Sequence, residues 1–421
     1  MNYIVVFLLF ISNIFAVDAT MEIVKRLEYI PGIVIEEKTM QSDNAGYYSK
    51  KIHKVLVGDF KVSGHFNVDD TLGSFSDFES LISLNPNVKG DLLLKYETIT
   101  NSDGSLLVNA KLINLKGNSL LFSKSYTVSK SERFPFLAHK IAVDVNKQIN
   151  APSIEWMENF VVFSKFITAK QSDIVISDYT LTFQKTVVKG GFNIFPKWAD
   201  KSKESFYYTK YLNKPTLFKY NLFSGKNEKI IESDGMLSCS DVSEDGTKLL
   251  LTMAPKGQPD IFVFDINSKT KKQVTNYSGI DVNGNFVDDD KRIVFVSDRL
   301  GYPNIFAQTI GSSGVEQLVY QGKNNNSCTA FKNYIVYTSR ESENEFGGNT
   351  FNLYMISTKS DFIRRLTPLG DNQFPKFSQD GESIIYIRNY KNQSALGIIR
   401  VNYNKSYLYP LQSGKIQSID W

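Results

Sequence analysis

A repeat of about 44 residues constrains the fold of this chain more than any other feature of its sequence. The repeat is marked by a bulky residue that closes a short strand-like stretch, and successive markers stand 44, 44, 45, 46 and 44 residues apart. Each marker except the last is followed by a strongly apolar stretch, and further strand-like stretches complete the unit. Four strands at this period are typical of a β-propeller blade. The markers are Trp198, Val242, Phe286, Phe331, Phe377 and Trp421.

The two ends of the repeat region predict how such a ring would close. Residues 160–188 supply three strand-like stretches without a first strand, and residues 416–421 supply a first strand with nothing after it. Together they would complete a sixth blade. We therefore predict a six-bladed β-propeller over residues 151–421, closed by the C-terminal strand. A solenoid is the structural alternative, but it does not explain why each end lacks what the other supplies.

The residues before the repeat follow a different pattern. Apolar residues at helical spacing predict one helix that begins at Ser42 or Asp43 and stops at Gly64, and a second over 131–149. We therefore predict an N-terminal α/β sandwich domain over residues 20–150, in a two-domain chain whose second part is all-β. The predicted strands of the first domain are 91–98, 106–115 and 119–128.

The first nineteen residues resemble a secretory signal peptide. The apolar run from Val5 to Phe15 is too short to span a bilayer, which takes about 20 residues, but it has the length of a signal-peptide core. Val17 and Ala19 offer a small-residue cleavage site. We expect a signal peptide over residues 1–19, with a mature protein that begins near Thr20 and does not span a membrane. A buried N-terminal strand is the alternative.

Charge and cysteine content exclude several classes of partner and site. There are 48 Lys and Arg against 44 Asp and Glu, and the net charge of +4 gives no electrostatic case for binding nucleic acid. Two cysteines exclude a disulfide scaffold and any multi-cysteine metal site. Cys239 and Cys328 each stand three residues before a marker, at the same height on blades two apart, so we expect two buried free thiols.

Motifs for catalysis are missing from the sequence. It contains no Gly-x-Ser-x-Gly, His-Glu-x-x-His, Walker or dinucleotide-binding motif, and no histidine follows His139. We interpret 288–290, three aspartates in a row, as a turn rather than a calcium site, because other repeats carry Asp-Gly turns there. His53 and His65 are interpreted as residues of a helix surface and a turn, and His139 as a structural histidine. We therefore predict a protein that is not an enzyme and holds no cofactor or metal.

The loops that enter the first strands are the candidate binding surface. In a propeller these loops gather around the axis, and here they are small and polar: SDGM, GIDVN, GKNNNS and GDNQ. An axial mouth is concave, which favours an interaction site. Ordinary solvated loops are the alternative for any single residue.

Two motifs ahead of the predicted blades are similar to those of the TolB family, the periplasmic component of the Tol–Pal system. They are GDFKVSGHF at 58–66 and AHKIA at 138–142, and the turns at 243–246 and 378–381 resemble the blade signature of the family. The resemblance covers residues 21–421. It implies a monomeric periplasmic adaptor that binds TolA and the peptidoglycan-associated lipoprotein Pal, and that supports outer-membrane integrity and constriction at cell division. Other outer-membrane proteins are further candidate partners.

The resemblance also implies which residues bind these partners. Two other functions stay open: a propeller that gates a prolyl-oligopeptidase-like hydrolase, although no hydrolase domain follows Trp421, and a periplasmic ligand sensor. Met236 is expected to be an exposed apolar residue among polar neighbours. The implied TolA contacts are Met21, Glu22, Ile23, Val24 and Lys25. The implied Pal contacts at the axial mouth are Ser233, Asp234, Met236, Asp281, Asn283, Asn325, Asn326, Asn372 and Gln373.

Overall fold

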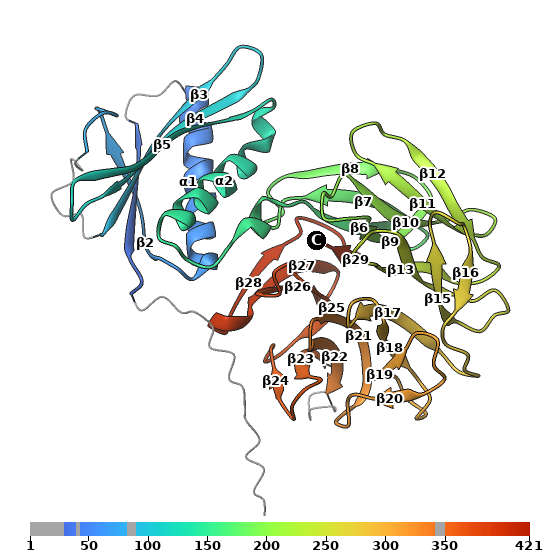
Figure 1. The fold of residues 1–421 in the computed structure, drawn as a ribbon. Coiled ribbons are helices and arrows are strands. Elements are labelled where there is room, and N and C mark those ends of the chain that lie inside the picture. Colours follow the sequence, from blue (N-terminus) through green and yellow to red (C-terminus); the bar gives the residue numbers. More distant parts are fainter. Residues whose placement is uncertain (1–28, 39–42, 82–89, 342–349) are drawn as a thin grey trace, which may run out of the picture.

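The computed structural model describes residues 29–38, 43–81, 90–341 and 350–421. Two predictions fall outside these ranges, namely the signal peptide over 1–19 and the TolA-binding residues Met21, Glu22, Ile23, Val24 and Lys25. The described residues form an N-terminal α/β domain and a C-terminal β-propeller, which confirms the predicted two-part architecture (Figure 1).

The N-terminal domain is a five-stranded mixed sheet with two helices packed on one face (Figure 1). The helices place Ile52, Leu56 and Ile141 in one core with the sheet residues Ile35 and Leu94. Both helices and three of the strands agree with the sequence-based prediction. The strand order is β2-β1-β3-β4-β5. The elements are β1 (Gly32–Lys38), α1 (Asp43–Ser63), β2 (Asn67–Phe75), β3 (Leu92–Thr100), β4 (Leu106–Asn114), β5 (Ser119–Val128), a 3-10 turn (Ser131–Arg133) and α2 (Phe134–Gln148).

Antiparallel four-stranded groups make up the propeller, and each starts with a strand that ends at or beside a predicted marker. The groups are β9 (Phe192–Trp198), β10 (Ser205–Tyr211), β11 (Pro215–Asn221) and β12 (Asn227–Glu232); β13 (Leu237–Val242), β14 (Lys248–Met253), β15 (Asp260–Asp265) and β16 (Lys271–Gln273); β17 (Asp281–Val287), β18 (Arg292–Ser297), β19 (Asn304–Thr309) and β20 (Val315–Gln317); β21 (Lys323–Phe331), β22 (Tyr334–Glu341), β23 (Thr350–Ser357) and β24 (Ile363–Arg365); and β25 (Asp371–Phe377), β26 (Ser383–Tyr390), β27 (Gln393–Arg400) and β28 (Lys405–Pro410).

The remaining strands come from the two ends of the propeller region and share one sheet. The last strand, β29, pairs antiparallel with β6, so that Asp420 lies opposite Val162. Figure 1 shows β29, in dark red, beside the green strands that open the propeller. These strands are β6 (Val161–Thr168), β7 (Gln171–Ser177), β8 (Gln184–Val188) and β29 (Ile416–Asp420), and two 3-10 turns lie at Glu155–Glu158 and Val401–Tyr403.

The two domains share a buried contact. Val62 and Val143, from the two helices, belong to one apolar cluster with Trp156, Tyr179 and Trp421 of the propeller. A buried core of this kind fixes the two domains to one another, because separating them would expose its apolar surface to water. Within the described ranges, no helix has both the length and the apolar character needed to cross a membrane.

Candidate functional site

Every first strand of the propeller begins at the same end of the molecule, which we call the entry end. In an antiparallel group, the loop between the second and third strands also lies at this end, as does the loop that leads to the next first strand. A cavity of about 580 Å³ opens here, between the group β25–β28 and the strands β6 and β29. The entry end is therefore hollowed rather than flat.

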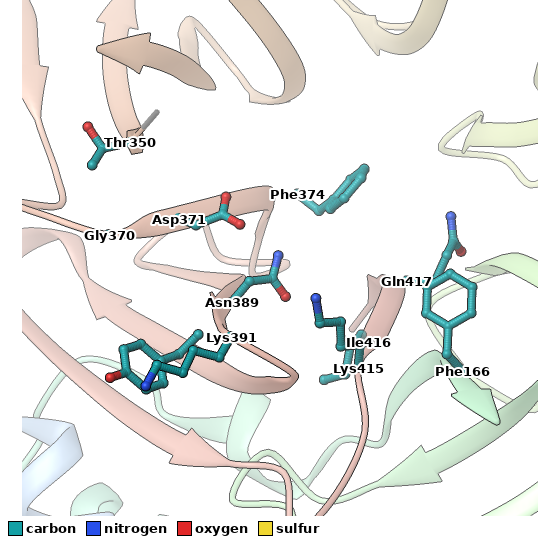
Figure 2. Close-up of a pocket in the computed structure, with 11 residues that line it drawn as sticks. Phe166, Thr350, Gly370, Asp371, Phe374, Asn389, Lys391, Lys415, Ile416 and Gln417 are labelled. Atoms are coloured by element: carbon teal, nitrogen blue, oxygen red, sulfur yellow. The ribbon is translucent and has the colours of Figure 1, made fainter. Parts of the chain in front are cut away.

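Aromatic and basic side chains line this entry cavity. Figure 2 shows the ring of Phe374 turned away from β25 into the open space, with Phe166 and Gln417 on neighbouring strands. Phe374 has a φ of 53°, and the register of β25 against β26 shifts beside it, which turns its side chain out of the regular pleat. The other lining residues are Thr350, Gly370, Asp371, Asn389, Tyr390, Lys391, Lys415 and Ile416.

Large apolar side chains are exposed in the loops around the same end. Tyr320 is 79% exposed and Tyr390 is 70% exposed. Single exposed apolar residues are ordinary, but a gathering of them on one end of a domain is typical of a protein interaction surface. The residues that share this location and exposure are Ile167, Tyr211, Leu212, Ile280, Leu300, Tyr320, Leu369 and Tyr390, which we call the entry-end apolar ring.

Two of the polar residues that were assigned to the axial mouth from sequence are buried below its loops and form hydrogen bonds to them. Asn372 is fully buried, and its Nδ2 donates to the carbonyl of Leu369 at 3.1 Å and to Asn352 Oδ1 at 3.1 Å. Asn325 repeats this arrangement, with Gln321 and Asn304 as acceptors at 3.0 and 2.9 Å. Both amides therefore shape the mouth, since their donors are already engaged within the fold.

Asp281 and Asn283 are also engaged in internal contacts. Asp281 is fully buried, and both its oxygens lie 3.1 Å from Arg299 Nη2. Asn283 accepts a hydrogen bond at 2.6 Å from the backbone N–H of Cys328, on the next first strand. The two side chains therefore stabilise the entry end from inside.

The remaining predicted contacts divide between surface and interior. Asp234 is exposed and pairs with Lys214 at 2.5 Å, whereas Ser233 is buried. Asn326 and Gln373 are half-buried. The expectation that Met236 is exposed is wrong, because it is half-buried where its carbonyl accepts the backbone N–H of Ala254.

The aromatic part of the entry end was not predicted from the sequence. The predicted contacts came only from loops that enter the first strands, whereas Tyr390 ends the second strand β26 and Leu212 lies in the loop between β10 and β11. An isolated aromatic residue in a polar loop, such as Tyr320 in VYQGKN, is the signal that would have found this surface.

A cluster of buried ionisable side chains lies at the contact between the two domains. His139, on α2, lies 2.8 Å from Asp59 Oδ2 on α1 and 3.4 Å from Asp178 Oδ2 of the propeller. Burial disfavours the charged imidazole, but the two carboxylates outweigh burial and raise the pKa of His139 above its usual value. The prediction that His139 is structural agrees with this full burial and with its place on α2.

His65 lies in the same contact. It lies 2.6 Å from Asn146 Oδ1 and 2.7 Å from the hydroxyl of Tyr403, which belongs to the propeller. Its side chain is fully buried in the bend that follows α1, and the expectation of a helix-surface position is wrong for His53, which is buried. Sequence spacing could not show the contact of His65 with Tyr403, since Tyr403 stands 338 residues away.

The other candidate sites give no metal centre among the described residues. Asp288, Asp289 and Asp290 form a turn, as predicted. Within the described ranges, no group of three or more His, Cys, Asp or Glu side chains is placed to hold a metal ion. Cys239 and Cys328 are buried free thiols, which confirms that prediction.

An α/β domain joined to a propeller with a hollowed, partly apolar entry end defines a two-domain β-propeller protein. The propeller family described as "TolB beta propeller domain" matches residues 159–421. The chain therefore belongs to the TolB family of the Tol–Pal system, as the motifs at 58–66 and 138–142 predicted.

Relatives support this membership over the whole chain. A protein of Wolinella succinogenes named "Tol-Pal system protein TolB" is 54% identical over 415 residues, which is 98% of each chain. The protein of the same name from Helicobacter hepaticus is 48% identical over 425 residues, covering both chains completely. The crystal structure of TolB from Acinetobacter baumannii covers 93% of this chain and 96% of its own, with a TM-score of 0.72 at 19% identity, and supports the fold.

Proposed function

We propose that this chain is a non-enzymatic periplasmic adaptor of the Tol–Pal system. In this proposal the entry end of the propeller binds the lipoprotein Pal, and the residues Met21–Lys25 bind TolA. The adaptor thereby supports outer-membrane integrity and constriction at cell division. The proposal includes a signal peptide over residues 1–19, an N-terminal domain over 20–150 and a monomeric protein in the periplasm.

The observation that supports the proposed binding of Pal is that the entry-end apolar ring and a cavity of about 580 Å³ lie at the same end of the propeller. Protein interfaces are enriched in tyrosine, and a few well-packed aromatic residues dominate their affinity. Tyr320 and Tyr390 stand on different groups of strands and are both more than two-thirds exposed. A partner that contacts several blades at once would bury them together.

We also propose that the propeller is a closed ring of six blades over residues 151–421. Five blades are the four-stranded groups, and the sixth consists of β29, β6, β7 and β8. The pairing of β29 with β6 supports this, because it joins the last strand of the chain to the first strands of the propeller region. Membership of the TolB family supports the same architecture.

Calorimetric titration with the soluble domain of Pal tests the binding surface. Tyr320→Asp and Tyr390→Asp should each weaken binding at least tenfold, because a carboxylate would be desolvated at an apolar contact. Phe223→Asp is the matched control, since Phe223 is 81% exposed in a loop at the opposite end of the propeller. Its affinity for Pal should equal that of the parent.

Two outcomes would overturn the assignment of the entry end. Either both tyrosine variants bind Pal as tightly as the parent, or Phe223→Asp loses binding while they retain it. The TolA proposal is tested separately by deleting Met21–Lys25. The truncated protein should lose TolA binding and retain Pal binding, and undiminished TolA binding would place that site elsewhere.

A further inference from the structure

A second cavity, of about 230 Å³, lies where the first strands finish, which we call the exit end. Lys197 and Lys376 line it from β9 and β25, each one residue before its marker, and Lys203 lines it from the loop after β9. Two carboxylates, those of Asp241 and Asp420, line the same space. Three ammonium groups therefore share the interior with two carboxylates.

Both carboxylates are engaged with Lys197. Its Nζ lies 3.2 Å from Asp241 Oδ1 and 3.3 Å from Asp420 Oδ1. The second oxygen of Asp241 accepts the backbone N–H of Phe286 at 2.9 Å, and that of Asp420 accepts the backbone N–H of Trp198 at 2.9 Å. Each carboxylate therefore bonds both to Lys197 and to the backbone of the first strand that follows its own around the propeller.

The other two lysines lack such a partner. Lys203 is 7% exposed and Lys376 is half-buried, and no hydrogen bond or ion pair to the Nζ of either occurs in the described part of the chain. Burial lowers the pKa of Lys203 to about 8 and also lowers that of Lys376. Nearby Lys197 acts in the same direction on both lysines, whereas Asp420, which is already engaged with Lys197, acts in the opposite direction and does not outweigh burial. A desolvated ammonium without an ion-pair partner of its own is destabilising, and an anion in the cavity would remove that cost.

The remaining charged groups of the cavity lie at its exposed rim. Lys201 pairs with Glu244 at 3.1 Å, and Asp200 accepts the backbone N–H of Ser202 at 2.8 Å. Among the described residues, Asp200 therefore has no cationic partner at the rim, but it is exposed to solvent, which screens its effect on the ammonium groups of the interior.

We propose that the exit-end cavity binds a small oxyanion, of the phosphate or carboxylate type, through Lys203 and Lys376. Two ammonium groups form charge-assisted hydrogen bonds with such an ion, which are stronger than neutral ones. The site lies at the opposite end of the first strands from the proposed Pal surface. The proposed binding of an oxyanion can therefore be tested independently of the proposed binding of Pal.

Calorimetric titration of the full chain with inorganic phosphate, and separately with malonate, tests the proposal against chloride at equal ionic strength. Phosphate or malonate should bind at one site and chloride should not. Binding should weaken at least tenfold from pH 7 to pH 9.5, because Lys203 loses its proton with a pKa of about 8. The absence of a binding heat for both oxyanions would overturn the proposal.

Lys203→Gln and Lys376→Gln separate a binding role from a structural one. Without an anion, each variant should melt at or above the temperature of the parent, since it removes a desolvated ammonium group that has no ion-pair partner of its own. The rise in melting temperature that phosphate or malonate causes in the parent should disappear. Lys201→Gln, at the rim of the same cavity, should retain it. The proposal is wrong if both interior variants keep the anion-dependent rise, or if Lys201→Gln loses it equally.

Discussion

The hydroxyl of Tyr179, in the propeller, donates a 2.5 Å hydrogen bond to Oδ1 of Asp59, on helix α1 of the N-terminal domain. The other oxygen of the same carboxylate faces His139 Nδ1 at 2.8 Å. Asp59 therefore takes one contact from each domain while fully buried. The two domains are joined by a polar network as well as by apolar packing.

Tyr179→Phe should destabilise the protein by about 1.5–3 kcal/mol, the usual range for a hydrogen bond to a charged group. The phenylalanine ring keeps the packing and removes the hydroxyl that donates to Asp59 and also contacts Tyr409. Tyr407→Phe is the control, because its hydroxyl crosses between the domains to the carbonyl of Lys61 at 2.6 Å and its loss should cost about 0.5–1.5 kcal/mol. Urea unfolding measures both. Equal costs would show that the Asp59 contact is no stronger than a neutral one.

The free energy of unfolding should fall as pH rises above 6.5 because of His139. Its pKa is raised in the folded protein, so the folded state retains a proton that the unfolded state releases near pH 6.5. The stabilisation is complete below that pH and is lost as pH rises through the folded pKa. His139→Gln should flatten this part of the curve. Chemical unfolding of both proteins from pH 6 to pH 9 measures the difference, and parallel curves would contradict a charged imidazole between Asp59 and Asp178.

Asn372→Ala should destabilise the propeller by about 1–3 kcal/mol, since it removes a fully buried amide and the hydrogen bonds that it donates. The affected acceptors include the carbonyl of Leu369 and Asn352 Oδ1. Asn326→Ala is the control, because Asn326 is half-buried and, within the described ranges, its amide bonds only to near neighbours in the chain, donating to Asn324 Oδ1 at 3.2 Å and accepting from Ser327 Oγ at 3.4 Å. Thermal unfolding compares the two variants. A larger loss of thermal stability for Asn326→Ala than for Asn372→Ala would contradict the structural role assigned to Asn372.

Removing Lys415–Trp421 should abolish cooperative unfolding and cause aggregation. The deletion removes β29 and exposes the edge of β6, and unpaired edges associate readily. It also removes Trp421, whose Nε1 donates to the carbonyl of Phe377 at 2.8 Å. Calorimetry and light scattering measure the outcome. A truncated protein that melts like the parent would show that β29 does not hold the ring together.

Cys239 and Cys328 should resist alkylation in the folded protein and react fully after unfolding without a reductant. Burial raises the pKa of both thiols, so the reactive thiolate is scarce as well as inaccessible. Mass spectrometry after iodoacetamide treatment measures the modification. A fraction that stays unmodified after unfolding would indicate a disulfide and contradict the two free thiols.

Sequence periodicity predicted the positions of the propeller strands well. Trp198, Phe331 and Phe377 end their strands as expected, because each four-stranded unit repeats the same packing at the same height. The helices α1 and α2 were found from the spacing of their apolar face. Strand β2 was missed, since it is an edge strand whose exposed residues include two aspartates and give no apolar alternation.

The candidate site was harder to predict, because a polar loop residue can point outward or inward. Asn372 and Asp281 were assigned to the surface, yet loop carbonyls and Arg299 hold them inside. Sequence alone does not show which direction satisfies more hydrogen bonds. Tyr320 and Tyr390 were missed for the opposite reason, since isolated apolar residues in loops follow no period.

The packing of Trp156 against Trp421, at 5.2 Å between ring centroids, has a mechanical consequence. Trp156 lies in the segment that links the N-terminal domain to the propeller, and Trp421 directly follows the last strand. The attachment of the first domain therefore lies against the end of β29, the strand that pairs with β6. We expect a pulling load applied to the N-terminal domain to act directly on this strand pairing, and a change that loosens the contact between the two tryptophans to weaken the pairing as well.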